Sequence, residues 1–149
     1  INGNTLFLVR RSIQGKDYCM PKDITKPLYG IYELPKNTNY VILVESCINA
    51  ITLASWGYPA IALLGTGTPI QINRLLTLGI KQIILALDPD GAGDKGNARL
   101  YKALHKSCLV WKIDMPREET DAQGIVIQKA KDVNDCTKAE FDELFANRY

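Results

Sequence analysis

From residue 40 onward the chain alternates short apolar runs with segments of helical periodicity, and this alternation limits the possible folds more than any other feature. Val41 to Val44 is fully apolar and rich in β-branched residues, which is typical of a strand buried on both faces. Similar patterns predict strands at 60–64, 82–87 and 108–113 and helices at 46–56, 70–78, about 94–106 and 138–146. Repeats of strand and helix indicate a parallel sheet of about four strands flanked by helices.

The first 39 residues differ from this pattern. They mix short β-prone runs with Gly, Lys and Pro, and they are basic. A few short strands and loops are expected here. We therefore divide the chain into a small, basic, β-containing segment over 1–39, which is part of a larger unit, and an α/β domain over 40–149.

Composition narrows the class of protein. A chain of 149 residues with 46% hydrophobic residues can build one compact core. The net charge of +2 is low for a protein that binds nucleic acid through overall charge alone. Four widely spaced cysteines argue against a zinc site or a disulfide framework and favour reduced thiols in a cytoplasmic protein.

Acidic residues follow the predicted strands directly. Glu45 comes after the strand that ends at Val44, and Asp88 and Asp90 follow the strand that ends at Leu87. A later polar loop, 131–135, adds Asp132. In parallel sheets the active groups lie in loops at the carboxyl ends of strands, so these residues are candidate functional groups.

Carboxylates at the ends of buried strands are costly unless a positive charge lies beside them. A divalent cation would satisfy several at once, and hard oxygen ligands suit Mg²⁺ or Mn²⁺. Gly91 and Gly93 allow a sharp turn and close approach to a ligand, and the following helix directs its amide end there, which favours phosphate. The alternative interpretation is that Asp88 and Asp90 form an ordinary turn, with Asp90 or Asp94 as a helix cap.

At these residues the sequence resembles the Toprim family of bacterial-type primases, topoisomerases and some nucleases. Val41 to Glu45 is similar to the primase stretch "V-E-G-x-x-D", and 62–66 is similar to its "A-x-L-G-T" loop. Residues 88–93 resemble "D-x-D-x-A-G", and 131–135 resemble the late "K-D-x-[ND]-[DE]" segment. Four motifs in the family's order place the chain nearest the DnaG-like primase branch, and the variable motifs resemble those of phage, plasmid or mobile-element proteins.

The likeness extends more loosely into the first 39 residues and has departures. Arg11, Gly15-Lys16 and Tyr18 resemble the primase stretch "R-x-x-x-G-x-x-K-Y", with Asp17 inserted before the tyrosine. Ser46 stands in place of the usual glycine, and Asn49 and Asn134 stand where acids are common. Each asparagine removes a negative charge from the rim of the expected metal site and leaves the number of metals open.

The resemblance implies a nucleotidyltransferase that copies single-stranded DNA into short RNA primers from ribonucleoside triphosphates. The implied metal ligands are Glu45, Asp88, Asp90 and Asp132, of which the first three are the catalytic residues. Glu45 would instead act as a general acid/base if it binds no metal. The implied phosphate loop contains Gly65, Thr66, Gly91 and Gly93, and the implied nucleic-acid contacts are Arg11, Lys16 and Tyr18.

Two other functions fit the same motifs. A Toprim nuclease or topoisomerase would use the metals to cleave or rejoin a phosphodiester, and a non-catalytic Toprim module would only bind DNA or a partner protein. The family also implies a replicative helicase as a partner, reached through domains that this sequence does not contain.

Overall fold

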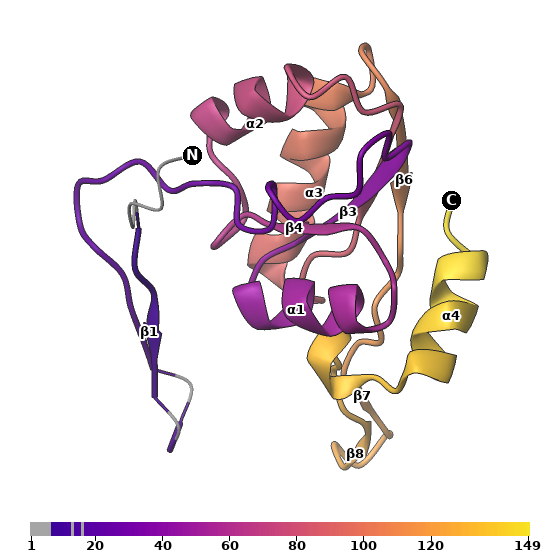
Figure 1. Ribbon diagram of the computed structural model, residues 1–149. Helices are drawn as coiled ribbons and strands as arrows, with labels where there is room; N and C mark the ends of the chain where they lie inside the picture. The colour runs from indigo at the N-terminus through magenta and orange to yellow at the C-terminus, as the bar shows by residue number, and fades with distance from the viewer. Residues whose placement is uncertain (1–6, 13, 16) are drawn as a thin grey trace.

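The structure is a computed structural model that describes residues 7–12, 14–15 and 17–149. Its centre is a four-stranded parallel sheet in the order β4-β3-β5-β6 (Figure 1). The strands are β3 (Tyr40–Val44), β4 (Ala60–Ala62), β5 (Gln82–Leu85) and β6 (Leu109–Lys112). The predicted α/β sheet is confirmed, and each strand lies within or beside its expected run.

Helices cover both faces of the sheet, as Figure 1 shows. On one face α1 (Cys47–Ser55) and α4 (Lys138–Ala146) pack Leu53 and Phe141 into the core. On the other face α2 (Pro69–Leu76) and α3 (Gly91–Leu104) contribute Leu75 and Leu100. Burial on both faces explains why the strands are continuous apolar runs rather than alternating ones.

Side-chain caps fix where the helices begin. Ser46 accepts a hydrogen bond from the Asn49 amide at the start of α1, and Thr68 and Thr137 form capping boxes before α2 and α4. Helix α3 begins at Gly91, earlier than the expected start near 94, because Asp90 caps it.

The N-terminal segment forms an antiparallel hairpin of β1 (Arg10–Arg11) and β2 (Tyr18–Cys19), which stands beside the sheet in Figure 1. Further along, Tyr29 and Ala62 exchange two backbone hydrogen bonds of 3.0 Å, so this segment continues the sheet at the edge of β4. Gly30 has φ +88°, and a Cβ there would lie 2.8 Å from the Ala60 carbonyl oxygen. Glycine is therefore required where the segment crosses the edge strand.

Between β6 and α4 the expected loop contains more structure than the sequence indicated. A second hairpin joins β7 (Glu119–Thr120) to β8 (Val126–Gln128), and a 3₁₀ helix, η1 (Val133–Asp135), follows. The β7–β8 turn is held by the Asp121 carboxylate, which accepts hydrogen bonds from two backbone amides. Such turn chemistry has only a weak sequence signal. Among the described residues, no helix is long and apolar enough to cross a membrane.

Candidate catalytic cleft

A cleft of about 370 Å³ opens between the N-terminal hairpin and the carboxyl ends of β3 and β5. It gathers residues from five separate segments of the chain. Among the predicted site residues, those that line it are Arg11, Tyr18, Glu45, Gly65, Asp88 and Asp132. The fold therefore brings together one predicted basic strand and acids from three predicted motifs.

Glu45 is a strongly perturbed acid of the cleft. Burial first, and then the nearby carboxylates of Asp88 and Asp90, raise the pKa of its carboxyl to about 7, while a backbone hydrogen bond from Asp88 opposes the shift. Its Oε1 atom is buried and has no hydrogen-bond partner among the described residues. Glu45 thus presents an unsatisfied oxygen where a cation would lower the cost of its charge.

The residue next to Asp88 is an amide rather than an acid. Asn49, on the first turn of α1, is only 1% exposed, and its Nδ2 lies 3.5 Å from Asp88 Oδ1. That distance is at the long limit of a hydrogen bond. The Oδ1 atom of Asn49 is buried without a partner among the described residues. A neutral side chain therefore occupies the position where the primase motif that the sequence resembles commonly has an acid.

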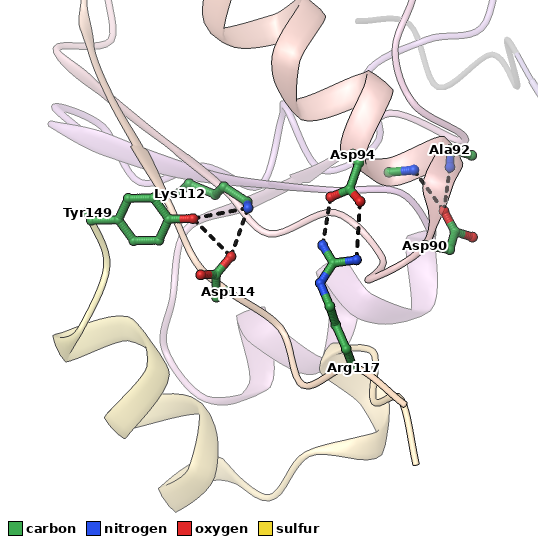
Figure 2. Close-up of polar contacts among 8 residues, drawn as sticks. Asp90, Ala92, Asp94, Lys112, Asp114, Arg117 and Tyr149 are labelled. Carbon is green, nitrogen blue, oxygen red and sulfur yellow. Dashed lines mark hydrogen bonds and ion pairs between the residues drawn. The ribbon is translucent and has the colours of Figure 1, made fainter. Parts of the chain in front are cut away.

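Asp90 does not line the cleft. Its Oδ1 accepts hydrogen bonds of 2.8 Å from the amides of Ala92 and Gly93, which makes it the N-cap of α3 (Figure 2). The cap interpretation of this residue is therefore confirmed. Metal binding by Asp90 remains a prediction, since only one of its two oxygens is used by the cap.

Gly93 allows Glu45 and Asp88 to approach the start of α3. A Cβ at this position would overlap the Asp88 carbonyl oxygen and lie 3.2 Å from Glu45 Oε1. No other residue fits without a shift of the backbone. The glycine of this motif is thus required by close packing against the two acids.

Residues of the predicted phosphate loop already form hydrogen bonds within the protein. The Gly65 amide donates to the Glu45 carbonyl oxygen at 3.1 Å, and the Gly93 amide donates to Asp90. Arg99 Nη2 donates to the Thr66 carbonyl oxygen at 2.7 Å and to its hydroxyl at 3.2 Å. Phosphate binding by Gly65, Thr66, Gly91 and Gly93 remains a prediction, and any ligand would have to compete with these internal bonds.

Asp132 lies at the far wall of the cleft and caps η1. Its Oδ1 accepts hydrogen bonds from the amides of Asn134 and Asp135 at 2.8 and 3.1 Å. The Asn134 side chain accepts a hydrogen bond from Thr52 on α1 at 3.1 Å. The polar late segment is therefore anchored beside the cleft, with a role for Asp132 in metal binding still a prediction.

The basic wall of the cleft faces these acids. Arg11 and Tyr18 are paired across the hairpin, with the guanidinium 5.3 Å from the ring centroid. Lys26 also lines the cleft, and its Nζ donates to the Leu64 carbonyl oxygen at 2.6 Å. The sequence did not single out Lys26, because nothing in the local pattern separates it from the other lysines of the basic segment. Lys16 lies outside the described residues.

The donor set fits a hard divalent cation with few protein ligands. No group of three or more His, Cys, Asp or Glu side chains within the described ranges is arranged to hold a metal ion. Glu45 and Asp88 nevertheless share the cleft, and Glu45 has an orphaned oxygen. Mg²⁺ keeps several waters and is commonly bound by one or two carboxylates together with substrate phosphates. The residues present therefore fit Mg²⁺ or Mn²⁺.

Comparison with protein families places this site in a known group. A family model described as Toprim-like matches residues 42–136. The chain belongs to the Toprim-like family. The matched range begins within β3 and ends just after η1, so it includes Glu45, Asp88 and Asp132. A comparison with curated proteins gives no match.

Solved structures with the same fold are primase cores. The zinc-binding and RNA polymerase domains of the Aquifex aeolicus primase match 99% of this chain with a TM-score of 0.73 and 24% identity. A DNA primase domain from Pseudomonas aeruginosa matches 95% with a TM-score of 0.68 and 21% identity. The primase fragment of the bacteriophage T7 primase-helicase protein matches 97%, with a TM-score of 0.65 and 21% identity.

This Toprim-like chain spans 38%, 50% and 57% of those three structures. At this identity the likeness establishes a shared fold. It extends over the N-terminal hairpin as well as the sheet, because nearly the whole chain is covered.

Proposed function

We propose that this chain is the catalytic core of a DNA primase, a metal-dependent nucleotidyltransferase that makes short RNA primers from ribonucleoside triphosphates on single-stranded DNA. The proposal rests on one observation above all. A single cleft joins the acids Glu45, Asp88 and Asp132 to the cations Arg11 and Lys26. Such a cleft provides acids for a metal and cations for the phosphates of a template and a nucleotide, both of which a polymerising site must hold.

The residues take distinct roles in this proposal. Glu45 and Asp88 hold Mg²⁺ or Mn²⁺, with Asp90 and Asp132 as further ligands. When bound, the metal neutralises charge on the triphosphate and stabilises the attacking and leaving oxygens of phosphoryl transfer. The alternative role for Glu45, if it binds no metal, is to accept the proton of a primer 3′-hydroxyl, for which a carboxyl with a pKa of about 7 is suited.

The basic wall binds the polyanionic substrates. Arg11 contacts template phosphates, Tyr18 provides a surface for base stacking, and Lys16 is a further predicted phosphate contact. Lys26, held by the Leu64 carbonyl oxygen, places its charge opposite the acids and would contact nucleotide phosphates. The division into a basic segment over 1–39 and a Toprim catalytic domain over 40–149 assigns template binding to the first and metal binding to the second.

Primer synthesis tests the proposal directly. The protein is incubated with single-stranded DNA, labelled ribonucleoside triphosphates and Mg²⁺ or Mn²⁺, with a primase zinc-binding domain and a replicative helicase added in a parallel reaction. Oligoribonucleotides that require both template and metal are expected. Metal-dependent cleavage of DNA without nucleotides would instead identify a nuclease, and DNA binding with no product in any reaction would identify a non-catalytic module.

A further inference from the structure

Helix α3 carries a row of cations on its exposed surface. Lys95, Arg99, Lys102 and Lys106 are all exposed and follow one another at intervals of four, three and four residues. At about 100° per residue these four positions fall within an arc of about 60°. Lys106 lies just beyond the C-cap His105, whose backbone is still right-handed helical at φ −60° and ψ −20°. We call these four residues the α3 stripe.

Beyond Asp94, which is paired with Arg117, the segments around the α3 stripe are poor in acids. Neither Asp nor Glu occurs from Ser46 to Leu87 or from Lys95 to Ile113. The neighbouring helix α2 therefore adds only a further cation, Arg74. The chain's net charge of +2 conceals this segregation of charge.

Several cations elsewhere on the described surface are paired with acids. Lys112 contacts Asp114 at 2.8 Å, and Arg117 contacts Asp94 at 2.7 Å, as Figure 2 shows. By contrast, the three lysines of the α3 stripe form no ion pair with any residue in 7–12, 14–15 or 17–149. Like charges at this spacing on a helix are unfavourable. An anionic ligand would remove that cost.

Helix α3 begins three residues after Asp88 of the cleft. Lys95 lies five residues after Asp90, in the first turns of the helix that the cleft loop leads into. Arg99 donates to the Thr66 and Gly67 carbonyl oxygens, and the loop it holds includes Gly65 of the cleft wall. From Lys95 to Lys106 the helix rises about 16 Å, a length over which one nucleic-acid strand carries about three to five phosphates.

We propose that the α3 stripe binds the phosphate backbone of a single nucleic-acid strand that runs from the cleft. The choice of nucleic acid rests on the proposed function. A membrane surface fits less well, because an interfacial helix must bury an apolar face in lipid. The apolar face of α3 is already buried in the core through Leu100 and Leu104, each 0% exposed.

The salt dependence of binding tests this site. Affinity for labelled single-stranded DNA and RNA oligonucleotides is measured by fluorescence anisotropy over a salt series, without nucleotides and with a chelator present. Three proteins are compared: the wild type, the stripe variant Lys95→Gln/Lys102→Gln/Lys106→Gln, and a control variant, Lys36→Gln/Lys129→Gln/Lys138→Gln. The control removes the same net charge from other exposed lysines. Arg99 is kept because it holds the loop.

The stripe variant is expected to bind with a salt slope smaller by about 2 and, at about 0.1 M salt, with about a hundredfold lower affinity. The control variant should keep the wild-type slope. Equal slopes for wild type and stripe variant, or an equal loss in the control, would overturn the proposal. Loss of binding to anionic vesicles with unchanged oligonucleotide binding would overturn it as well.

These outcomes are independent of primer synthesis. If the wild type makes no primer but only the stripe variant loses oligonucleotide binding, the proposed function fails and the α3 stripe stands. If the wild type makes primers and the stripe variant binds oligonucleotides normally, the proposed function stands and the proposal for the α3 stripe fails. Circular dichroism confirms that all three proteins are folded. Preference for the DNA or the RNA oligonucleotide then distinguishes a template path from a product path.

Discussion

The pKa values of two glutamates in this protein are shifted in opposite directions. The causes of the two shifts distinguish the cleft from the rest of the surface. Glu140, on α4, accepts hydrogen bonds from Lys131 and Thr137, which lower the pKa of its carboxyl to about 2. Burial and neighbouring carboxylates raise the pKa of Glu45, in the cleft, to about 7. On the surface, Glu140 and several other described acids are paired with cations. In the cleft the fold keeps a carboxylate unsatisfied, which is what a site that binds a cation requires.

The largest expected effect is the loss of primer synthesis when the charge of Asp88 in the cleft is removed. Asp88→Asn removes a charge that the proposed site needs and should lower primer synthesis by about a thousandfold, since metal stabilisation of the transition state amounts to several kcal/mol. Asp94→Asn, six residues along, is the matched control. Asp94 is exposed and paired with Arg117 (Figure 2), so primer synthesis should be unchanged. Equal rates for Asp88→Asn and wild type would exclude a catalytic role for Asp88.

Gly93 tests whether close packing holds the acids in place. Gly93→Ala puts a Cβ onto the Asp88 carbonyl oxygen and should lower the free energy of unfolding by about 1–3 kcal/mol. Gly91→Ala is the control, because a Cβ there meets nothing within 4 Å. Alanine should be neutral or slightly stabilising at that helical position. Chemical denaturation measures both, and similar stabilities for the two variants would contradict the packing argument.

Most of the sheet could be predicted because buried parallel strands have a strong sequence signal. The run Val41 to Val44 is buried in full, and the edge position of Glu45 followed from it. Asp90 illustrates the limit. Its sequence position fitted both a metal ligand and a cap, and only the backbone conformation of the turn decided that it caps α3. Side-chain direction in a loop depends on φ and ψ angles that residue type alone does not determine.

Contacts between segments that are distant along the chain could not be predicted from the sequence. Lys26 reaches the cleft because residues near Tyr29 pair with Ala62 at the sheet edge. An antiparallel pairing of this kind has no periodic signature, since it involves one bridge. The position of Lys26 is therefore a consequence of tertiary structure, whereas Arg11 and Tyr18 were found through their motif.

Asn49→Asp sharpens the comparison by adding the charge that is common at this position in the primase motif that the sequence resembles. Without metal, a second buried carboxylate beside Asp88 should lower the free energy of unfolding by about 1–2 kcal/mol. With metal, the added charge should tighten Mg²⁺ or Mn²⁺ binding by about tenfold. Thermal denaturation with a chelator and calorimetric titration with Mn²⁺ measure the two effects. Asn49→Leu, which has a similar volume and no charge, should show no gain in metal affinity. Unchanged metal affinity in Asn49→Asp would place the cation away from α1.

The smallest expected effect concerns the pH dependence of stability that Glu45 imposes in the absence of metal. Its pKa is raised from 4.5 to about 7 in the folded protein. The folded state therefore holds the proton more tightly than the unfolded state, and the protein loses stability as pH rises from 4.5 through 7. Because Glu45 is partly exposed to solvent, the loss should be only about 1 kcal/mol.

Glu45→Gln should abolish this loss of stability. Glu140→Gln should keep it, because the carboxyl of Glu140 is already ionised throughout that pH range. Denaturation curves across the range, recorded with a chelator, measure the difference. If wild type and Glu45→Gln lose stability equally as pH rises, the pKa of Glu45 is not raised in the folded protein. Its burial would then not favour the binding of a cation in the cleft.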